Sequence, residues 1–467
     1  MKKKLILLVA ALVLALLVPA AVMAQSPGGL AYTSGVQVVN LDSTTASIGL
    51  TYYNQDGSVA TTFPDTIAGN GSKTYFPIQA DVGFNGSLVI SSNKPITAIA
   101  NTVTTDFKYG AATTSFSAGA TTVNLPLIMC NNSGFNTWFN VQNTHPTENA
   151  NITINYAPGV SGVGGSENAS IPPGAAKTFN QATGSSTKNC STLGPTFIGS
   201  ASVTSNHPVV ATVMQLNTTS FATLLGYNGF ISAGSTSVVV PLVMAQNSGF
   251  FSGIQIQNVD GSSTDVTIVY APNQVANGFQ PANETCNGLG AGDSCTLIQA
   301  GGQWTQTYIG SATITGSQNL VATVNQISLG NPNAGPYGTS YEGFNPATAT
   351  SNIATPLIMS NNSGYFTGIQ VMNVGGGACA SVTIDYGPNS GGPFNPVNEV
   401  FSLGAGESHS VLQTGSPPGN GGANTWGANK YIGSAQISAP GCSIVATVNE
   451  LAIKKGDNFF TYIGYNH

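Results

Sequence analysis

Apolar and polar side chains alternate along most of this chain in short runs. In the run "SGIQIQNV", Ile254 and Ile256 fall on one side of an extended backbone, and the glutamines between them fall on the other. The run "VTIVY", which ends at Tyr270, alternates in the same way. Side chains of a β-strand point alternately to its two faces, so this period of two predicts half-buried strands. Turn-forming Gly, Pro, Asn and Asp separate the runs, and no window beyond residues 1–24 has a convincing helical period.

The runs recur in a fixed order. The stretches "PLIMCNNSGFNTWFNVQNT", "PLVMAQNSGFFSGIQIQNV" and "PLIMSNNSGYFTGIQVMNV" begin at Pro126, Pro241 and Pro356, so they are spaced by 115 residues. A later phrase, "YIGSATITGSQNLVATVNQI" from Tyr308, occurs in four versions rather than three. The most divergent is "FNGSLVISSNKPITAIANTV" from Phe84. The chain therefore contains four repeats, and the first lacks the "PLxM" run.

About seven short strands in such a repeat match the size of an immunoglobulin-like sandwich. The sequence thus predicts an all-β protein: four tandem immunoglobulin-like antiparallel β-sandwich domains after a signal peptide. A solenoid of short repeats or a propeller with four large blades would be the alternatives. The expected divisions are a signal peptide at 1–24, a divergent first repeat at 25–118, and further repeats at 119–233, 234–348 and 349–467.

The N-terminus has the pattern of a secretory signal. Lys2, Lys3 and Lys4 precede an apolar run, and small residues stand just before Gln25. An uncleaved anchor is the alternative interpretation. No later stretch is long and apolar enough to span a bilayer, so we expect no membrane span after cleavage. The pattern predicts an extracellular protein, either secreted or at the cell surface.

Charge is scarce and negative. All eleven basic residues are lysines, and without Lys2, Lys3 and Lys4 the chain has 8 lysines against 17 carboxylates, a formal charge of −9. No lysine or arginine lies between Lys188 and Lys430. Binding to a phosphate backbone requires such cations to replace counterions, so this composition argues against a nucleic-acid partner.

The six cysteines follow the repeats. An even number of cysteines in an exported protein favours disulfides. The three pairs occupy different places in their repeats, whereas a metal site shared by the repeats would recur in register. We therefore expect three separate disulfides, which join Cys130 to Cys190, Cys286 to Cys295, and Cys379 to Cys442.

Two tryptophans are candidate ligand-binding residues. Trp304 and Trp426 stand shortly before the "YIGSA" strand in polar loops, where an aromatic ring on the rim of a sandwich could stack on a sugar. The alternative is that each ring covers the open end of its own core. The second repeat has no tryptophan at this place, so the fold itself does not require one.

The sequence offers no catalytic constellation. The stretch "GDSC", from Gly292 to Cys295, resembles a serine nucleophile loop, but its repeat has no histidine to act as a base. The four histidines are dispersed, and no metal-ligand or phosphate-loop spacing occurs. Asp260 and Asp265 flank a turn and could contribute to a weak calcium site, although such a site needs more oxygens. We therefore expect no enzyme activity, no metal and no cofactor.

The missing "PLxM" run also bears on assembly. Four sandwiches joined by short links predict an extended rod, roughly 150 Å long. One sandwich would be a strand short, and an unpaired strand edge is a template for another chain. One hypothesis is end-to-end assembly by strand addition. The other is that Gly28–Thr33 or Asn458–Gly464 fills the edge within the same molecule.

With its signal, repeat length and strand alternation, the chain resembles bacterial extracellular proteins built from tandem immunoglobulin-like sandwiches, such as surface stalks, adhesins and surface-layer components. The resemblance implies a structural or adhesive role outside the cell. The implied partners are other copies of the protein or a cell-surface polysaccharide. The alternative function is a polysaccharide-binding module that uses rim aromatics such as Trp304 and Trp426.

Overall fold

The computed structural model describes residues 27–467, except residues 82, 183–185 and 332. The predicted signal peptide, residues 1–24, lies outside the described residues. The regular structure is almost all strand, and the strands pair antiparallel, which confirms the all-β prediction. The two helical segments in the described part of the chain, Pro27–Gly29 and Pro346–Thr348, are single turns of three residues, and neither could cross a membrane.

We refer to residues 25–118, 119–233, 234–348 and 349–467 as blocks 1 to 4. Block 1 contains β1 (Tyr32–Asn40), β2 (Ala46–Asn54), β3 (Val59–Ile67), β4 (Ser72–Tyr75), β5 (Gly86–Ser92), β6 (Ile96–Thr104) and β7 (Gly110–Thr114). Block 2 contains β8 (Ala120–Cys130), β9 (Phe135–Asn143), β10 (Ala150–Ser161), β11 (Gly165–Ile171), β12 (Ala176–Asn180), β13 (Phe197–Asn217) and β14 (Thr223–Asn228).

Block 3 contains β15 (Ser235–Ala245), β16 (Phe250–Asn258), β17 (Thr264–Tyr270), β18 (Glu284–Leu289), β19 (Ser294–Ile298), β20 (Tyr308–Ser328) and β21 (Tyr337–Glu342). Block 4 contains β22 (Asn352–Ser360), β23 (Tyr365–Asn373), β24 (Cys379–Tyr386), β25 (Glu399–Leu403), β26 (Ser408–Leu412), β27 (Tyr431–Ser438), β28 (Ile444–Ala452), β29 (Phe459–Ile463) and β30 (Tyr465–Asn466).

Each block has two groups of strands that share one long strand or its two halves. In block 3, the first half of β20 pairs with β17 and β15, and its second half pairs with β16 and β21. β18 and β19 lie at the outer edges of these two groups. In blocks 1 and 4 the long strand is divided in two, as β5 and β6 and as β27 and β28. Apolar side chains from the two groups meet in a separate core in each block.

The recurring "NSG" phrase forms the turn that follows each "PLxM" strand. In block 2, Asn131, Ser133 and Gly134 have φ angles of 48°, 51° and 84°, in the left-handed region that Gly and Asn tolerate best. The backbone N–H groups of Asn132 and Phe135 each donate a hydrogen bond to the other residue's carbonyl across the turn. This turn returns the chain from β8 into β9. The same conformations recur at Gln246, Ser248, Gly249, Asn361, Ser363 and Gly364.

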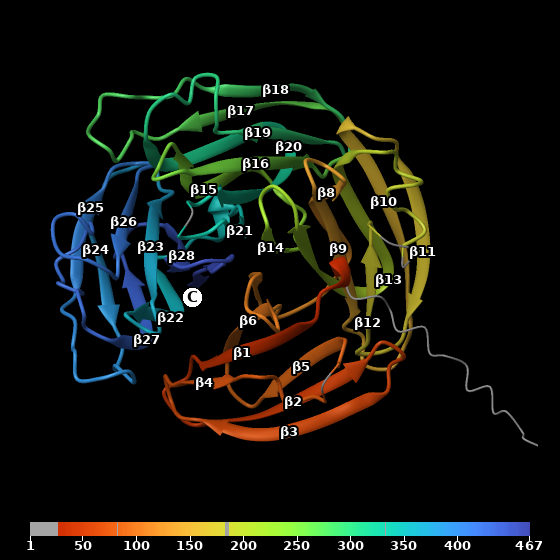
Figure 1. Ribbon diagram of the computed structural model, residues 1–467, viewed down its shortest axis with the longest axis horizontal. Helices are drawn as coiled ribbons and strands as arrows, with labels where there is room; N and C mark the ends of the chain where they lie inside the picture. The colour runs from red at the N-terminus through yellow and green to blue at the C-terminus, as the bar shows by residue number, and fades with distance from the viewer. Residues whose placement is uncertain (1–26, 82, 183–185, 332) are drawn as a thin grey trace, which may run out of the picture.

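The four blocks lie around a common centre (Figure 1). One short strand from the end part of each block lies there: β7, β14, β21 and β29. β14 packs beside β7 and β21, and β29 packs beside β21 and β7. The chain therefore does not extend as the rod that we expected. It closes on itself, which is nearer to the propeller alternative, although each block keeps its own core. The reason is that these strands are buried on both faces, as the fully buried pattern of β14 shows.

Three glycines allow the central strands to approach closely. A Cβ atom at Gly338 of β21 would lie 2.7 Å from Thr223 of β14. At Gly226 of β14 it would lie 3.1 Å from Ala111 of β7, and at Gly110 of β7 it would overlap the ring of Phe460. A side chain at these positions would push neighbouring blocks apart.

A repeated serine links consecutive blocks. Ser200, in the "GSA" phrase of block 2, donates a 2.6 Å hydrogen bond to the carbonyl of Gly292 in block 3. Ser311 of block 3 donates equivalently to Gly406 of block 4 at 2.7 Å. Ser87 of block 1 donates to Gly174 of block 2. The same phrase thus makes the same contact at three junctions, which gives successive blocks a common relative orientation.

Candidate functional site

Block 1 has an open strand edge. Its strand β5 pairs with β2 on one side and has no strand partner on the other side within the described part of the chain. In block 2 the corresponding half of β13 is flanked by β10 and by β8, the strand that carries the "PLxM" run. Blocks 3 and 4 have the same arrangement, with β15 and β22 in the position of β8. The missing run therefore leaves a row of backbone N–H and C=O groups unpaired along β5.

A groove of about 1950 Å³ runs along this edge. Tyr52, Phe84, Leu88 and Ile90 of block 1 contribute to one wall, and Trp138 and Met214 of block 2 contribute to the other. Phe84, Leu88 and Ile90 are only partly buried, whereas the residues at the matching positions of block 2, Phe197, Ala201 and Val203, are buried. The groove therefore exposes apolar surface that the other blocks cover with a strand.

A tyrosine holds the "PLxM" strand in the other three blocks. The hydroxyl of Tyr227 in β14 donates a 2.8 Å hydrogen bond to the carbonyl of Leu127. Tyr341 and Tyr462 donate equivalently to Leu242 and Leu357, at 2.6 and 2.7 Å. The strand register places Thr113 of β7 at this position in block 1. Within the described residues, block 1 thus has neither the strand nor the tyrosine that binds it.

Both ends of the described chain reach this groove. Pro27 lines it from one side, and Tyr465, Asn466 and His467 line it from another. The Tyr465 hydroxyl donates a 2.7 Å hydrogen bond to the carbonyl of Ala98 in block 1.

Neither of the two segments expected to fill the edge within the molecule does so. Tyr32 and Thr33 begin β1, which pairs with β4 and β6. Most of Asn458–Gly464 forms β29, which pairs with β28. The edge of β5 thus remains free of both segments.

The two candidate sugar-binding tryptophans are buried. Trp304 is 2% exposed and Trp426 is 0% exposed, and both belong to the cores of their blocks. Trp304 meets Tyr270 edge-on at 4.9 Å between ring centroids, and Trp426 meets Tyr386 at 5.3 Å. Neither ring presents a face to a sugar here. Their burial fits the alternative that each covers the end of its own core.

A buried polar cluster recurs in blocks 2, 3 and 4. In block 2 the Tyr156 hydroxyl donates to Glu167 at 2.7 Å and accepts from Gln181 at 3.2 Å, and burial raises the pKa of this tyrosine above its ordinary value. The corresponding residues are Tyr270, Glu284, Gln299, Tyr386, Glu399 and Gln413. The alternation of side chains identified the strand that ends at Tyr270 but not the partners of this tyrosine, although each glutamine ends a recurring strand phrase. Because the clusters repeat inside cores, they serve packing.

The remaining sequence candidates have structural partners. The "GDSC" stretch runs from a turn into β19 at a junction, where the carbonyl of Gly292 accepts from Ser200. Asp260 accepts from the backbone N–H of Asn319, and Asp265 accepts from that of Gly288, each at 2.7 Å. No group of three or more His, Cys, Asp or Glu side chains suited to a metal ion occurs among the described residues.

The fold brings together two histidines that lie far apart in the sequence. The rings of His145 and His207 are 4.3 Å apart, and His207 lies 3.0 Å from the carboxylate of Glu148. His145 also lines the groove of block 1. No sequence motif indicates this pair, because His145 lies in the loop after β9 and His207 lies within β13.

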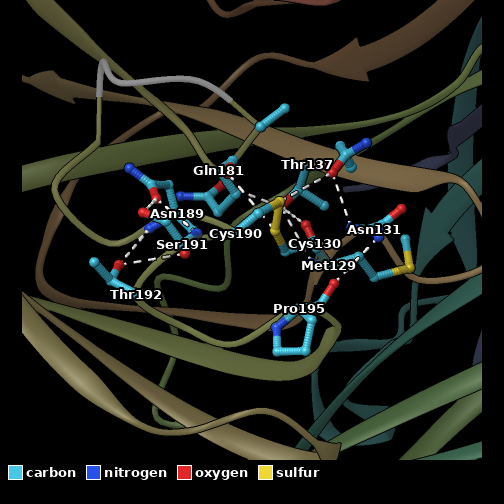
Figure 2. Close-up of a disulfide and its surroundings, with 12 residues drawn as sticks. Met129, Cys130, Asn131, Thr137, Gln181, Asn189, Cys190, Ser191, Thr192 and Pro195 are labelled. Carbon is cyan, nitrogen blue, oxygen red and sulfur yellow. Dashed lines mark hydrogen bonds between the residues drawn. A yellow bond between two sulfur atoms is a disulfide. The ribbon is translucent and has the colours of Figure 1, made fainter.

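All three expected disulfides are present: Cys130–Cys190, Cys286–Cys295 and Cys379–Cys442. Figure 2 shows Cys130, at the end of β8, joined to Cys190 in the connection between β12 and β13. The N–H of Cys190 donates to the carbonyl of Gln181, and the amide of Asn131 donates to the carbonyl of Pro195. The first disulfide thus fastens the "PLxM" strand of block 2 to the rest of its block.

Comparisons with known proteins give little to build on. No family model matches the chain, and no curated protein matches it. Among solved structures, the crystal structure of Thermotoga maritima 1070 is similar at 21% identity with a TM-score of 0.19. The match covers 25% of this chain and 98% of that one. A score this low supports no conclusion about fold or function, so the function must be inferred from the molecule itself.

Proposed function

We propose that this protein is a secreted or cell-surface structural protein whose four repeats are immunoglobulin-like sandwiches joined into one rigid unit. Its three disulfides suit an oxidising compartment outside the cytoplasm. The low charge and the Gly-, Ser-, Thr- and Asn-rich composition suit an extracellular β-protein. The role is mechanical: the unit would act as a spacer or lattice subunit, without catalysis.

The observation that carries this proposal is the closure of the four blocks around β7, β14, β21 and β29. Polar side chains connect the blocks in the interior. Gln215 of block 2 exchanges hydrogen bonds with Asn325 of block 3 at 2.7 and 3.1 Å. Gln326 of block 3 and Asn449 of block 4 are paired in the same way. Repeats locked to each other on several sides resist bending and proteolysis better than repeats that touch only end to end.

A buried carboxyl strengthens this centre. Asp457 of block 4 accepts backbone N–H groups from Leu224 of block 2 and from Gly338 of block 3, at 2.7 and 2.8 Å. One side chain thus holds three blocks together. Burial raises the pKa of Asp457 well above its ordinary value.

Assembly by strand addition belongs to the same proposal, and the free edge of β5 supports it. The polysaccharide-binding alternative has less support, because Trp304 and Trp426 would have to leave their cores to stack on a sugar. A protein that binds sugar through them would lose that binding in the W304A and W426A variants.

Electron microscopy and proteolysis of the secreted protein test the structural role. We expect single particles in which four blocks surround a centre, alone or joined into filaments or sheets, and slow cleavage by non-specific proteases, which are used because trypsin has no Lys or Arg to cleave after between Lys188 and Lys430. Flexible strings of separate beads, with rapid cleavage between blocks, would contradict the proposal. The Gly338→Leu variant, which places a large side chain against Thr223, should open the ring and accelerate cleavage, whereas Gly376→Leu has nothing within 4 Å of its added Cβ and serves as the control.

A further inference from the structure

We propose that the groove of block 1 binds one extended strand supplied by another polypeptide, and that this strand has the uncharged, apolar pattern of the "PLxM" run. The strand would pair with the free edge of β5 and complete block 1 as β8 completes block 2. The inference deepens the assembly part of the proposed function and rests on it only for the source of the strand.

The three complete blocks show what such a strand looks like. β8, β15 and β22 each pair with the strand that corresponds to β5, and each pairing shifts register at the same place, near the Pro-Leu step. The side chains of Leu125 and Ile128 of β8 are 0% exposed and belong to the core of block 2. The three strands contain no charged residue. A strand seated on β5 would therefore place apolar side chains against Leu88 and Ile90 and bond through its backbone.

The groove also shows where the partner strand should differ. Thr113 stands where Tyr227, Tyr341 and Tyr462 bind the leucine after the proline, so the middle of the groove accepts a larger side chain than leucine. The wall across from β5 includes Trp138 and Met214 of block 2, which favours an apolar or aromatic residue there. Lys94, Asp81 and His145 line the groove as well, so a strand with charged residues would meet both signs of charge.

The source of the strand distinguishes this proposal from filling within one molecule. Predicted cleavage after Ala24 leaves Gln25 and Ser26 ahead of Pro27, whereas β8 and β15 each have 11 residues. Two residues cannot supply such a strand. The uncleaved chain does contain a competing segment, because "VPAAVMAQ" at 18–25 is closely similar to "VPLVMAQ" at 240–246. If that segment were retained, it could occupy the groove of its own molecule.

Peptide binding tests the groove directly. The probe is a fluorescent peptide with the sequence of β22, Asn352–Ser360, added to the secreted protein. We expect saturable binding by fluorescence anisotropy. We also expect hydrogen exchange at residues 86–92 to slow at least tenfold, while exchange in β13 stays unchanged. A scrambled peptide, and the same peptide N-methylated on alternate residues so that it cannot complete the ladder, should not bind. Absence of binding, or equal binding of the scrambled and N-methylated peptides, would overturn the proposal.

A matched pair of variants identifies the bound face. Leu88 of β5 lines the groove and packs against the core of block 1, whereas Val59 of β3 is 54% exposed and does not line the groove. Leu88→Lys should therefore weaken peptide binding at least tenfold, and Val59→Lys should leave it unchanged. A thermal melt of each variant confirms that the protein is folded. Equal effects of the two substitutions would place the peptide elsewhere and contradict the proposal.

A comparison of two forms of the chain tests the competing occupant. The form that begins at Gln25 should bind the peptide and show fast exchange at residues 86–92 before the peptide is added. If the cell exports the form that begins at Met1, and that form has slow exchange and does not bind the peptide, residues 18–25 are the occupant and the proposal is overturned. Failure of the structural role would appear differently, as flexible beads in electron microscopy together with normal peptide binding.

Discussion

Blocks 1 and 2 contain the same strand in two different environments. "FNGSLVIS" in block 1 and "FIGSASVT" in block 2 both form a strand, which pairs with β2 in block 1 and with β10 in block 2. In block 2 this strand has partners on both sides, and the core contains 26 buried apolar residues of the block together with Ile327 of block 3. In block 1 it has one partner among the described residues, and the core contains 9 buried apolar residues. The local sequence therefore determines the strand, but a distant segment determines whether its edge and its inner face are covered.

The difference also indicates how block 1 is held in place. Its own core is small, so contacts with blocks 2 and 4 must contribute more to its stability than the corresponding contacts do for the other blocks. β7 packs against β14 and β29 at the centre, and Asn228 of block 2 donates to the carbonyl of Thr114 at 2.9 Å. Block 1 is thus expected to unfold first when the ring opens.

The largest expected effect is on pH dependence, because buried carboxyls lie at the junctions. Burial raises the pKa of Glu450 from 4.5 to about 8 and that of Glu342 to about 7. Above pH 4.5 the unfolded chain loses these protons while the folded chain keeps them. The contribution of these two carboxyls to the free energy of unfolding should therefore be greatest near or below pH 4.5. It should fall by several kcal/mol as the pH rises to about 8.

Calorimetry across this range measures the slope. Glu450, whose Oε1 atom is buried without a hydrogen-bond partner, lines a pocket together with Val36 and Ile99 of block 1, so block 1 should loosen before block 2. The Glu450→Gln variant should flatten the slope. Stability that rises between pH 5 and 8 would show that these carboxyls are ionised in the folded protein.

Removal of the Cys130–Cys190 disulfide should make block 2 more like block 1, which has no cysteine. The bond closes a loop of 60 residues, so the Cys130→Ser, Cys190→Ser double variant should lose about 4 kcal/mol in the chain-entropy model. The 9-residue loop of Cys286–Cys295 should be worth about 2.5 kcal/mol. Denaturant unfolding of each variant gives the two values. A larger loss from the shorter loop would mean that loop length does not control the effect.

Equivalent core substitutions should have unequal costs. Phe197 is 0% exposed, and Phe197→Ala should lower the free energy of unfolding by about 3–5 kcal/mol. Phe84, at the matching position of block 1, is only partly buried, so Phe84→Ala should cost about half as much or less. Urea unfolding followed by tryptophan fluorescence compares the two. Equal costs would show that the groove of block 1 is filled in the protein under study.

The smallest expected effect comes from the tyrosine that binds the "PLxM" strand. Tyr227→Phe removes the hydroxyl that donates to the carbonyl of Leu127 and should cost about 1 kcal/mol. Hydrogen exchange in β8 should accelerate while exchange in β5 stays the same. Thr113→Ser in block 1 is the control, because that position binds no "PLxM" strand, and it should leave exchange in β8 unchanged.

Much of the local structure could be read from the alternation of side chains. Ile254 and Ile256 are buried as predicted, but Gln255 and Gln257 on the other face are buried as well, so β16 is not the half-buried strand that the alternation predicted. The second face is covered by a distant segment, as the hydrogen bond from Gln257 to the carbonyl of Ala201 in block 2 shows. The cysteine pairs could be predicted because each pair lies within one repeat. The loops around Trp304 and Trp426 are polar, and their polarity concealed that both rings turn inward against Tyr270 and Tyr386. A polar loop sequence indicates that the loop backbone lies near solvent. It does not determine whether a single large ring in that loop points outward or packs into the core.

The sequence by itself determined that the described chain is almost entirely β and that its phrases recur, and it predicted where the repeats begin and that the first has no "PLxM" run. These properties follow from local alternation, turn residues and spacing, which need no knowledge of distant contacts. Only the tertiary structure decided that the repeats close around β7, β14, β21 and β29, that the two tryptophans are interior, and that no strand of the described residues covers the second edge of β5. The physical reason is that the second face of a strand is buried or exposed by segments a hundred or more residues away, and no local pattern of apolar residues records which segment that is.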